Sequence, residues 1–160
     1  MSEVVNKVVS ILSNVGEAVL VVPLDALLPA DSPRCDGENE DHVQTLAESG
    51  AVLPPIIVHR SSMRIIDGMH RLKAARLRGC SEIEVRFFDG NEADAFVIAV
   101  RSNTTHGLPL SPADREASAV RILAMHPEWS DRSIASAAGM STRRISAIRA
   151  RTTEIGRAHV

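Results

Sequence analysis

The 160-residue sequence predicts an α+β domain followed by an all-α segment. Three observations carry this prediction. Short β-branched runs alternate with helical patterns up to about residue 110. A glycine corner joins a strand to a helix between Ile65 and Gly79. After residue 110 only helical patterns follow, with Gly139 between the last two helices.

Residues 1–17 are predicted to form an amphipathic helix. Valine and leucine side chains recur on one helical face, and the pattern stops near Gly16. Such a face can pack on the body of the protein or on a second copy. Residues 18–110 then read as the α+β domain.

The elements of this domain follow from local patterns. β-branched runs predict strands, apolar residues at helical spacing predict helices, and proline or glycine marks the breaks between them. In chain order, we expect a strand over 18–22, a helical turn within 23–29, a helix over 40–49, a hairpin of strands 56–59 and 64–66, a helix ending at Gly79, a strand over 83–88 and a helix over 91–102.

The glycine corner offers a seat for a phosphate. Gly68 permits a sharp turn, and the helix that follows begins with free backbone N–H groups at the positive end of its dipole. His70 and Arg71 add an imidazole and a guanidinium at the same place. Such a corner is also common as plain scaffold, so both interpretations stay open.

Several motifs resemble a known superfamily. Gly68-Met69-His70-Arg71, followed by Ala74, is similar to the Gly-x-x-Arg box of the ParB/sulfiredoxin superfamily. The order of elements across residues 19–110 resembles the N-terminal domain of ParB-type proteins, which implies a mixed sheet with helices. The further motifs Leu53-Pro54-Pro55-Ile56, Ile66-Asp67-Gly68, Val85-Arg86-Phe87-Phe88-Asp89-Gly90 and His106-Gly107-Leu108-Pro109-Leu110 look like those of StrR-type regulators of antibiotic gene clusters.

The resemblance implies a nucleotide site at the glycine turn. In this superfamily the turn holds nucleotide phosphates, and partition-type relatives couple CTP binding to DNA sliding, so CTP with Mg²⁺ is the implied ligand. The residues carried over as its binding set are Gly68, Met69, His70, Arg71, Asn103, Thr104 and Arg34, the last from Ser32-Pro33-Arg34.

Catalysis is not expected at this turn. Met69 stands where a sulfiredoxin has its reactive cysteine, and a thioether cannot act as that nucleophile. Ser102-Asn103 keeps the asparagine of the final ParB box but lacks its acid. We therefore name no catalytic residue and expect binding with little or no hydrolysis. A CTP-binding switch or slow NTPase in DNA partition remains the alternative function.

Residues 111–153 have the spacing of a helix-turn-helix segment. Ser111-Pro112 opens a first helix, Ser130 or Asp131 caps a second, and Ser141 or Thr142 caps a third. Gly139 supplies a left-handed turn between the second and third helices. The side chains predicted to fill the wedge between them are Ile134, Ala135, Met140, Ile145 and Ile148.

The outer face of the third helix is basic and hydroxylated. Residues 111–160 carry eight arginines against five acids, a balance that favours a polyanionic partner. Double-stranded DNA is the predicted partner, although a solvated face on a small bundle has the same pattern. The predicted DNA-binding residues are Ser141, Thr142, Arg143, Arg144, Ser146 and Arg149.

The remaining features limit other classes of function. Cys35 and Cys80 form no CxxC pair, so we expect reduced thiols and no metal site. No run of apolar residues could span a membrane, and no signal-peptide pattern opens the chain, which predicts a cytoplasmic, nucleoid-associated protein.

Residues 154–160 lose all periodicity and match a sequencing-adapter read-through, so we expect a non-native tail and a natural chain that continues past Thr153. The sequence as a whole predicts a DNA-binding transcription regulator that acts as a dimer.

Overall fold

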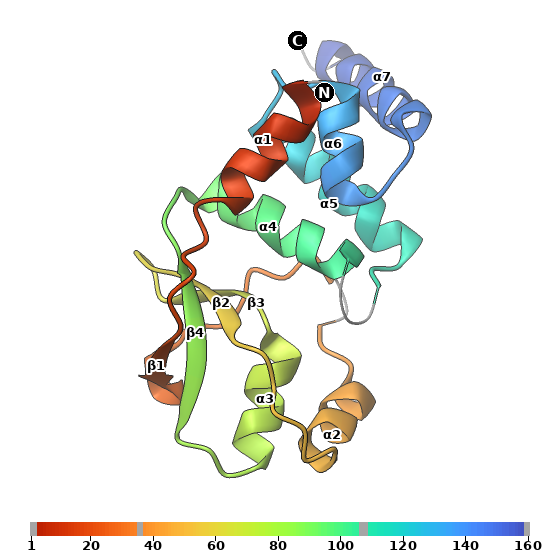
Figure 1. Ribbon diagram of the computed structural model, residues 1–160. Helices are drawn as coiled ribbons and strands as arrows, with labels where there is room; N and C mark the ends of the chain where they lie inside the picture. Colours follow the sequence, from red (N-terminus) through yellow and green to blue (C-terminus); the bar gives the residue numbers. More distant parts are fainter. Residues whose placement is uncertain (1–2, 35–36, 106–108, 159–160) are drawn as a thin grey trace.

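The computed structural model describes residues 3–34, 37–105 and 109–158, and it confirms the α+β class (Figure 1). Cys35, most of the His106–Leu110 motif and the last two residues of the tail lie outside the described residues. The elements, in chain order, are α1 Glu3–Leu12, β1 Leu20–Pro23, the 3₁₀ turn η1 Leu24–Ala26, α2 Glu40–Glu48, β2 Ile56–His59, β3 Arg64–Asp67, α3 Met69–Leu77, β4 Glu82–Phe88, α4 Glu92–Thr105, α5 Pro112–Met125, α6 Asp131–Ala138 and α7 Thr142–Ala158.

The four strands form one mixed sheet in the order β1-β4-β2-β3. β2 and β3 pair antiparallel as the predicted hairpin, with Val58 opposite Ile65. β4 lies parallel to β2 and antiparallel to β1, so Val85 pairs with Ile56 on one side and with Leu20 on the other. The sheet therefore has the mixed pairing that the ParB resemblance implied.

A first apolar core lies between the sheet, η1 and α3. Burial of these side chains supplies the main driving force for folding of this part. The buried members are Leu24, Leu27, Ile56, Val58, Ile65, Leu72, Ala75, Val85 and Phe87. α2 packs beside α3 at the end of the molecule away from the other helices (Figure 1).

A second apolar core joins the remaining helices. α1 packs on α6 and α4, and α4 also contacts β3, α5 and α6. Val8 and Ile11 of α1 are buried in the same cluster as Ile134 of α6 and Ile145 of α7. The N-terminal helix thus packs against α6, which lies more than 100 residues away along the chain (Figure 1).

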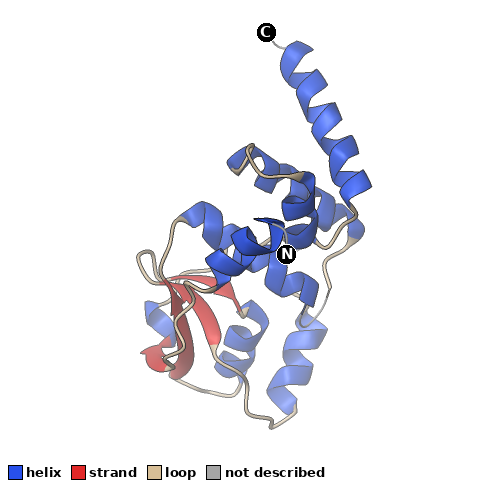
Figure 2. Ribbon diagram, turned by 45° about the horizontal axis from the view of Figure 1, so that its top comes forward, coloured by secondary structure: helices blue, strands red, loops and turns tan. Residues whose placement is uncertain are grey.

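Two helices are longer than the sequence patterns indicated. α4 runs to Thr105, so Asn103 and Thr104 lie inside its last turns. α7 runs to Ala158 and projects beyond the other helices (Figure 2). Its exposed turns need no apolar periodicity to stay helical, and the hydroxyls of Thr152 and Thr153 bond to carbonyls one turn back. None of the helices in the described ranges is both long and apolar enough to cross a bilayer.

Candidate functional site

α6 and α7 begin with serine caps that fix where each helix starts. The Ser130 hydroxyl accepts a hydrogen bond from the Ser133 backbone N–H at 3.2 Å. The Ser141 hydroxyl accepts one from the Arg144 backbone N–H at 3.2 Å. Each cap satisfies a donor that the helix itself leaves unpaired. Of the two candidate caps considered for each helix, the serine is therefore the one used.

The turn between α6 and α7 is a left-handed glycine cap. Gly139 has φ 67° and ψ 40°, and the Met140 N–H donates to the Ala135 carbonyl at 3.1 Å. A Cβ at Gly139 would lie 3.1 Å from Thr104 Cγ2. The turn therefore lies directly against α4, and the close approach gives a second reason for a glycine there.

The first turn of α7 presents an exposed polar face. Ile145 and Ile148 point inward and are buried, whereas Ser141, Thr142, Arg143 and Ser146 are exposed. The Arg143 guanidinium makes no hydrogen bond or ion pair with any described residue. Arg132, in the first turn of α6, is also exposed and unpaired within the same ranges. Our sequence reasoning did not include Arg132, although the first helix of such a pair commonly crosses the phosphate backbone.

Arg144 shares a carboxylate with Arg151. Nη2 of Arg144 lies 2.9 Å from Glu116 Oε2, and Nη2 of Arg151 lies 2.6 Å from Glu116 Oε1. Hydrogen bonds from Arg151 and then Arg144 hold the pKa of Glu116 below its ordinary value. Glu116 of α5 thus neutralises part of the basic charge of α7.

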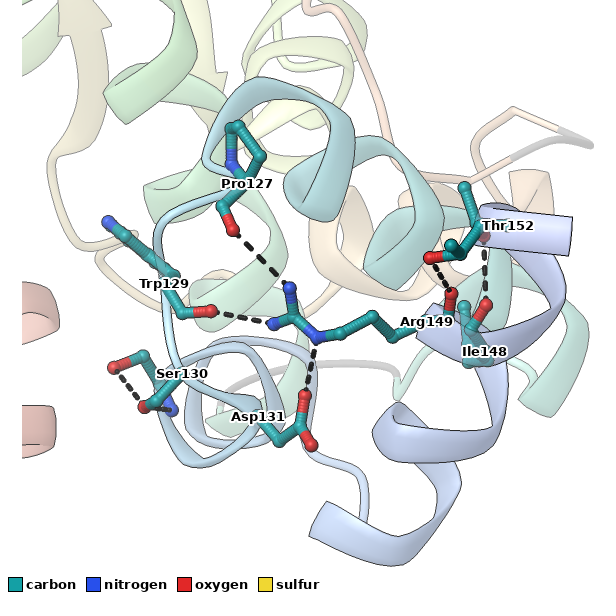
Figure 3. Close-up of polar contacts among 9 residues, drawn as sticks. Pro127, Trp129, Ser130, Asp131, Ile148, Arg149 and Thr152 are labelled. Atoms are coloured by element: carbon teal, nitrogen blue, oxygen red, sulfur yellow. Dashed lines mark hydrogen bonds and ion pairs between the residues drawn. The ribbon is translucent and has the colours of Figure 1, made fainter. Parts of the chain in front are cut away.

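Arg149 is the centre of a local hydrogen-bond network (Figure 3). Its Nε lies 2.8 Å from Asp131 Oδ1, and its other nitrogens donate to the Trp129 carbonyl at 2.6 Å and the Pro127 carbonyl at 3.3 Å. These contacts tie α7 to the loop that precedes α6. Arg149 was predicted as a DNA contact, and in this arrangement its guanidinium is engaged within the protein.

The glycine turn between β3 and α3 has the expected sharp geometry. Gly68 has φ 121°, and a Cβ there would lie 2.7 Å from Ile56 Cβ. Arg71 faces away from the open side of the turn. Its Nη1 donates to the carbonyls of Pro54 at 3.2 Å and Pro55 at 2.7 Å, and its Nη2 lies 3.0 Å from Asp67 Oδ2. Arg71 therefore holds the Pro54–Pro55 segment on the helix start.

A small cavity lies in front of this turn. Five residues of the predicted nucleotide set line it: Arg34, Gly68, Met69, His70 and Asn103. Two others do not. Arg71 makes the contacts described above, and the Thr104 hydroxyl donates to the Arg101 carbonyl on the side of α4 that faces Gly139. The cavity volume is about 30 Å³, which is about the space of one water and far less than a triphosphate needs.

His70 is held as a neutral acceptor. Its Nε2 accepts a hydrogen bond from the Asn39 backbone N–H at 3.1 Å, so its proton is on Nδ1. Partial burial, followed by electrostatic interaction with His42 and Arg34, holds the pKa of His70 below its ordinary value.

In the wall of this cavity the Asn103 amide nitrogen donates to the Ala99 carbonyl at 2.7 Å, and Arg34 Nη1 donates to the Pro109 carbonyl at 3.4 Å. The carboxylates of Glu38 and Asp67 also line it.

Comparisons with known proteins agree with this architecture. Residues 10–104 match the family described as the ParB N-terminal domain. The chain is 54% identical over 136 residues to the "Streptomycin biosynthesis operon possible regulatory protein" of Streptomyces griseus, covering 85% of this chain and 39% of that protein. It is 46% identical over 132 residues to "Transcriptional regulator NovG" of Streptomyces niveus, covering 82% and 42%. The chain thus spans about two fifths of the length of these two relatives.

Solved structures show the same fold. The C-terminally truncated chromosome-partitioning protein ParB of Caulobacter crescentus, complexed to the centromeric parS site, matches with a TM-score of 0.59 and 22% identity, covering 81% of this chain and 69% of that one. The same protein complexed with CTP-gamma-S matches with a TM-score of 0.50 and 22% identity, covering 82% and 76%.

Proposed function

The chain belongs to the ParB N-terminal domain family, and on this basis we propose that it is a sequence-specific DNA-binding transcription regulator that docks as a dimer. The names of the two Streptomyces relatives, a possible regulatory protein of a biosynthesis operon and a transcriptional regulator, support this proposal. A protein with this function would act in the cytoplasm, at the nucleoid, where the DNA that it binds is located.

One observation carries the proposal: the exposed polar start of α7 after the Gly139 turn. α6 and α7 are joined by the left-handed turn at Gly139, and the start of α7 carries Thr142, Arg143 and Ser146 outward, which supports the predicted helix-turn-helix. In such motifs the first residues of the second helix meet base edges in the major groove. The unpaired Arg143 suits a guanine edge or a phosphate, and Arg132 on α6 suits a phosphate.

Dimeric docking follows from the size of this surface. A single recognition helix makes few base contacts, and two copies can read two half-sites about one helical turn apart. The paired operator would then show the twofold symmetry of the protein.

A footprint on selected DNA tests this function. Duplexes enriched from a random pool by the purified chain should show two protected half-sites about one turn apart. Arg132→Ala should weaken protection, and Arg76→Ala, which removes an exposed arginine from α3, should leave it unchanged. A pool that yields no enriched sequence, or protection that is unaffected by Arg132→Ala and by Arg143→Ala, would contradict the proposal.

Nucleotide binding at the Gly68 turn is the second candidate. It is favoured by the convergence of Arg34, His70 and Asn103 on one cavity and by the CTP-gamma-S complex of the Caulobacter ParB. The cavity does not fit a triphosphate as it stands, so binding would require it to widen. Met69 and Ser102 supply no nucleophile or acid, so we propose affinity without turnover.

Calorimetric titration tests this second candidate. CTP with Mg²⁺ should release heat with the wild-type chain and less with Asn103→Ala, whose amide lines the cavity. Asn103 is preferable to Arg71 as the test residue because Arg71 holds Pro54 and Pro55 in place. If neither CTP nor ATP releases heat, the Gly68 turn has a structural role only.

A further inference from the structure

A second and much larger cavity lies between β3, α4 and α5. Its volume is about 660 Å³, within the range of pockets that enclose small organic ligands. It shares Ala30 and Ile66 with the Gly68 cavity but otherwise has its own lining. Neither the DNA surface nor the nucleotide proposal uses this space.

The wall formed by α4 leaves this cavity open because its side chains are small. Ala95 and Ala99 lie one turn apart and face the cavity, with Phe96 between them. Met125 of α5 completes the apolar part. An apolar body of a ligand would therefore find an apolar surface on one side.

Two guanidinium groups meet at the polar side. Arg121 of α5 forms an ion pair with Asp31, and its Cζ lies 3.8 Å from the centre of the Phe96 ring. Arg64 of β3 donates from Nη1 to the Pro29 carbonyl at 2.9 Å.

These guanidinium groups retain unused donors. A guanidinium has five N–H groups, so the contacts above leave donors of both Arg64 and Arg121 available.

Arg64 is the arginine of this lining that is left for an anion. Asp31 is the only carboxylate bonded to either guanidinium among the described residues, and it bonds to Arg121. The other carboxylate of the lining is Glu92, which is exposed to water in the first turn of α4. Arg64 is the better anchor for the anion, because Arg121 is already paired with Asp31.

We propose that this cavity binds a small organic acid. Its carboxylate or phosphate group would bond to Arg64 and Arg121, and its ring or chain would lie against Ala95, Phe96 and Ala99. Such a ligand would contact β3, α4 and α5 together and stabilise their packing. This inference is independent of the proposed DNA and nucleotide functions.

Protein-observed NMR on the ¹⁵N-labelled chain tests the site with three probes of matched ring size. Phenylacetate and phenyl phosphate carry an anion, and phenethylammonium carries a cation. The anions should cause saturable shifts at the amides of residues 62–66 and 95–99, and the difference between their affinities would tell a carboxylate preference from a phosphate preference. The cation should cause no such shifts.

Two variants make the test specific. Arg64→Gln should weaken anion binding about tenfold, because it removes a charged hydrogen-bond donor. Ala95→Leu should narrow the cavity beside Phe96 and weaken the binding of both anions. Arg60→Gln, which alters an exposed arginine of the β2–β3 turn outside the lining, should bind like the wild type.

Several results would overturn the proposal. These include shifts confined to the Gly68 turn, equal binding of the cation, and anion affinity unchanged in Arg64→Gln. No saturable shift with either anion at millimolar concentration would overturn it as well.

Discussion

The guanidinium of Arg149 and the carboxylate of Asp131 lie 2.8 Å apart and join α7 to the start of α6. The same guanidinium also bonds to the carbonyls of Trp129 and Pro127 (Figure 3). The two helices of the proposed DNA-binding motif are thus connected by a polar clamp in addition to their apolar wedge.

Arg149→Ala should therefore reduce stability. The substitution leaves two backbone carbonyls and a partly buried carboxylate without their donor, at an expected cost of about 1 to 3 kcal/mol in the free energy of unfolding. Urea denaturation followed by circular dichroism measures this cost. The control Arg143→Ala removes an exposed arginine that has no partner among the described residues, and it should stay within about 0.5 kcal/mol of wild type. Equal stability of the two variants would contradict the clamp.

Gly139→Val should destabilise the turn between α6 and α7. A β-branched residue resists φ 67°, and its Cβ would press on Thr104, so we expect a loss of about 1 to 3 kcal/mol. Gly139→Asn is the matched control, because asparagine tolerates the left-handed region and should lose less. Thermal unfolding of the three proteins gives the comparison. If Gly139→Val and Gly139→Asn lose the same stability, the left-handed backbone conformation is not the reason that glycine is required at this position.

Glu116→Gln should strengthen binding to DNA of any sequence. It frees Arg144 and Arg151 from their shared carboxylate and leaves two guanidinium groups for phosphates. The slope of log affinity against log salt should steepen by up to about 2, since each new phosphate contact adds about 0.9. Glu84→Gln removes an equal charge from an exposed position on β4 and serves as the control. The same slope for both variants would show that Glu116 does not restrain these arginines.

His70 should make stability depend on pH below neutrality. Because its pKa is depressed in the folded state, the unfolded chain takes up a proton first as the pH falls below about 6.5, and stability is lost from there down to the folded pKa. His70→Gln should flatten this part of the stability profile. His42→Gln should flatten the stability profile less. The His42 ring lies 4.9 Å from the His70 ring and is a smaller cause of the lowered His70 pKa than burial is. A profile for His70→Gln that follows the wild type would refute the assignment.

The elements that short-range chemistry defines could be predicted from the sequence. Ser111-Pro112 at the start of α5, Gly139 at the turn and the hairpin between β2 and β3 all depend on residues within a few positions of one another. The convergence of Arg34, Gly68 and Asn103 on one cavity also followed from the family resemblance.

The contacts that occupy individual arginines could not be predicted. Arg149 bonds to residues about 20 positions away, and Arg121 finds Asp31 at a separation of 90. No periodicity in the sequence indicates which exposed arginine will have an acid or a carbonyl as partner. The packing of α1 on α6 is another long-range relationship of this kind.

The most direct test of the DNA-binding proposal is the affinity of Arg143→Ala for a duplex selected by the wild-type chain, measured by fluorescence anisotropy at fixed salt. A base-reading arginine should contribute about 1 to 3 kcal/mol, which is about a 5- to 150-fold increase in Kd. Arg76→Ala should bind like the wild type. An Arg143→Ala protein that is folded and binds the selected duplex with unchanged affinity would contradict the proposal that α7 reads DNA.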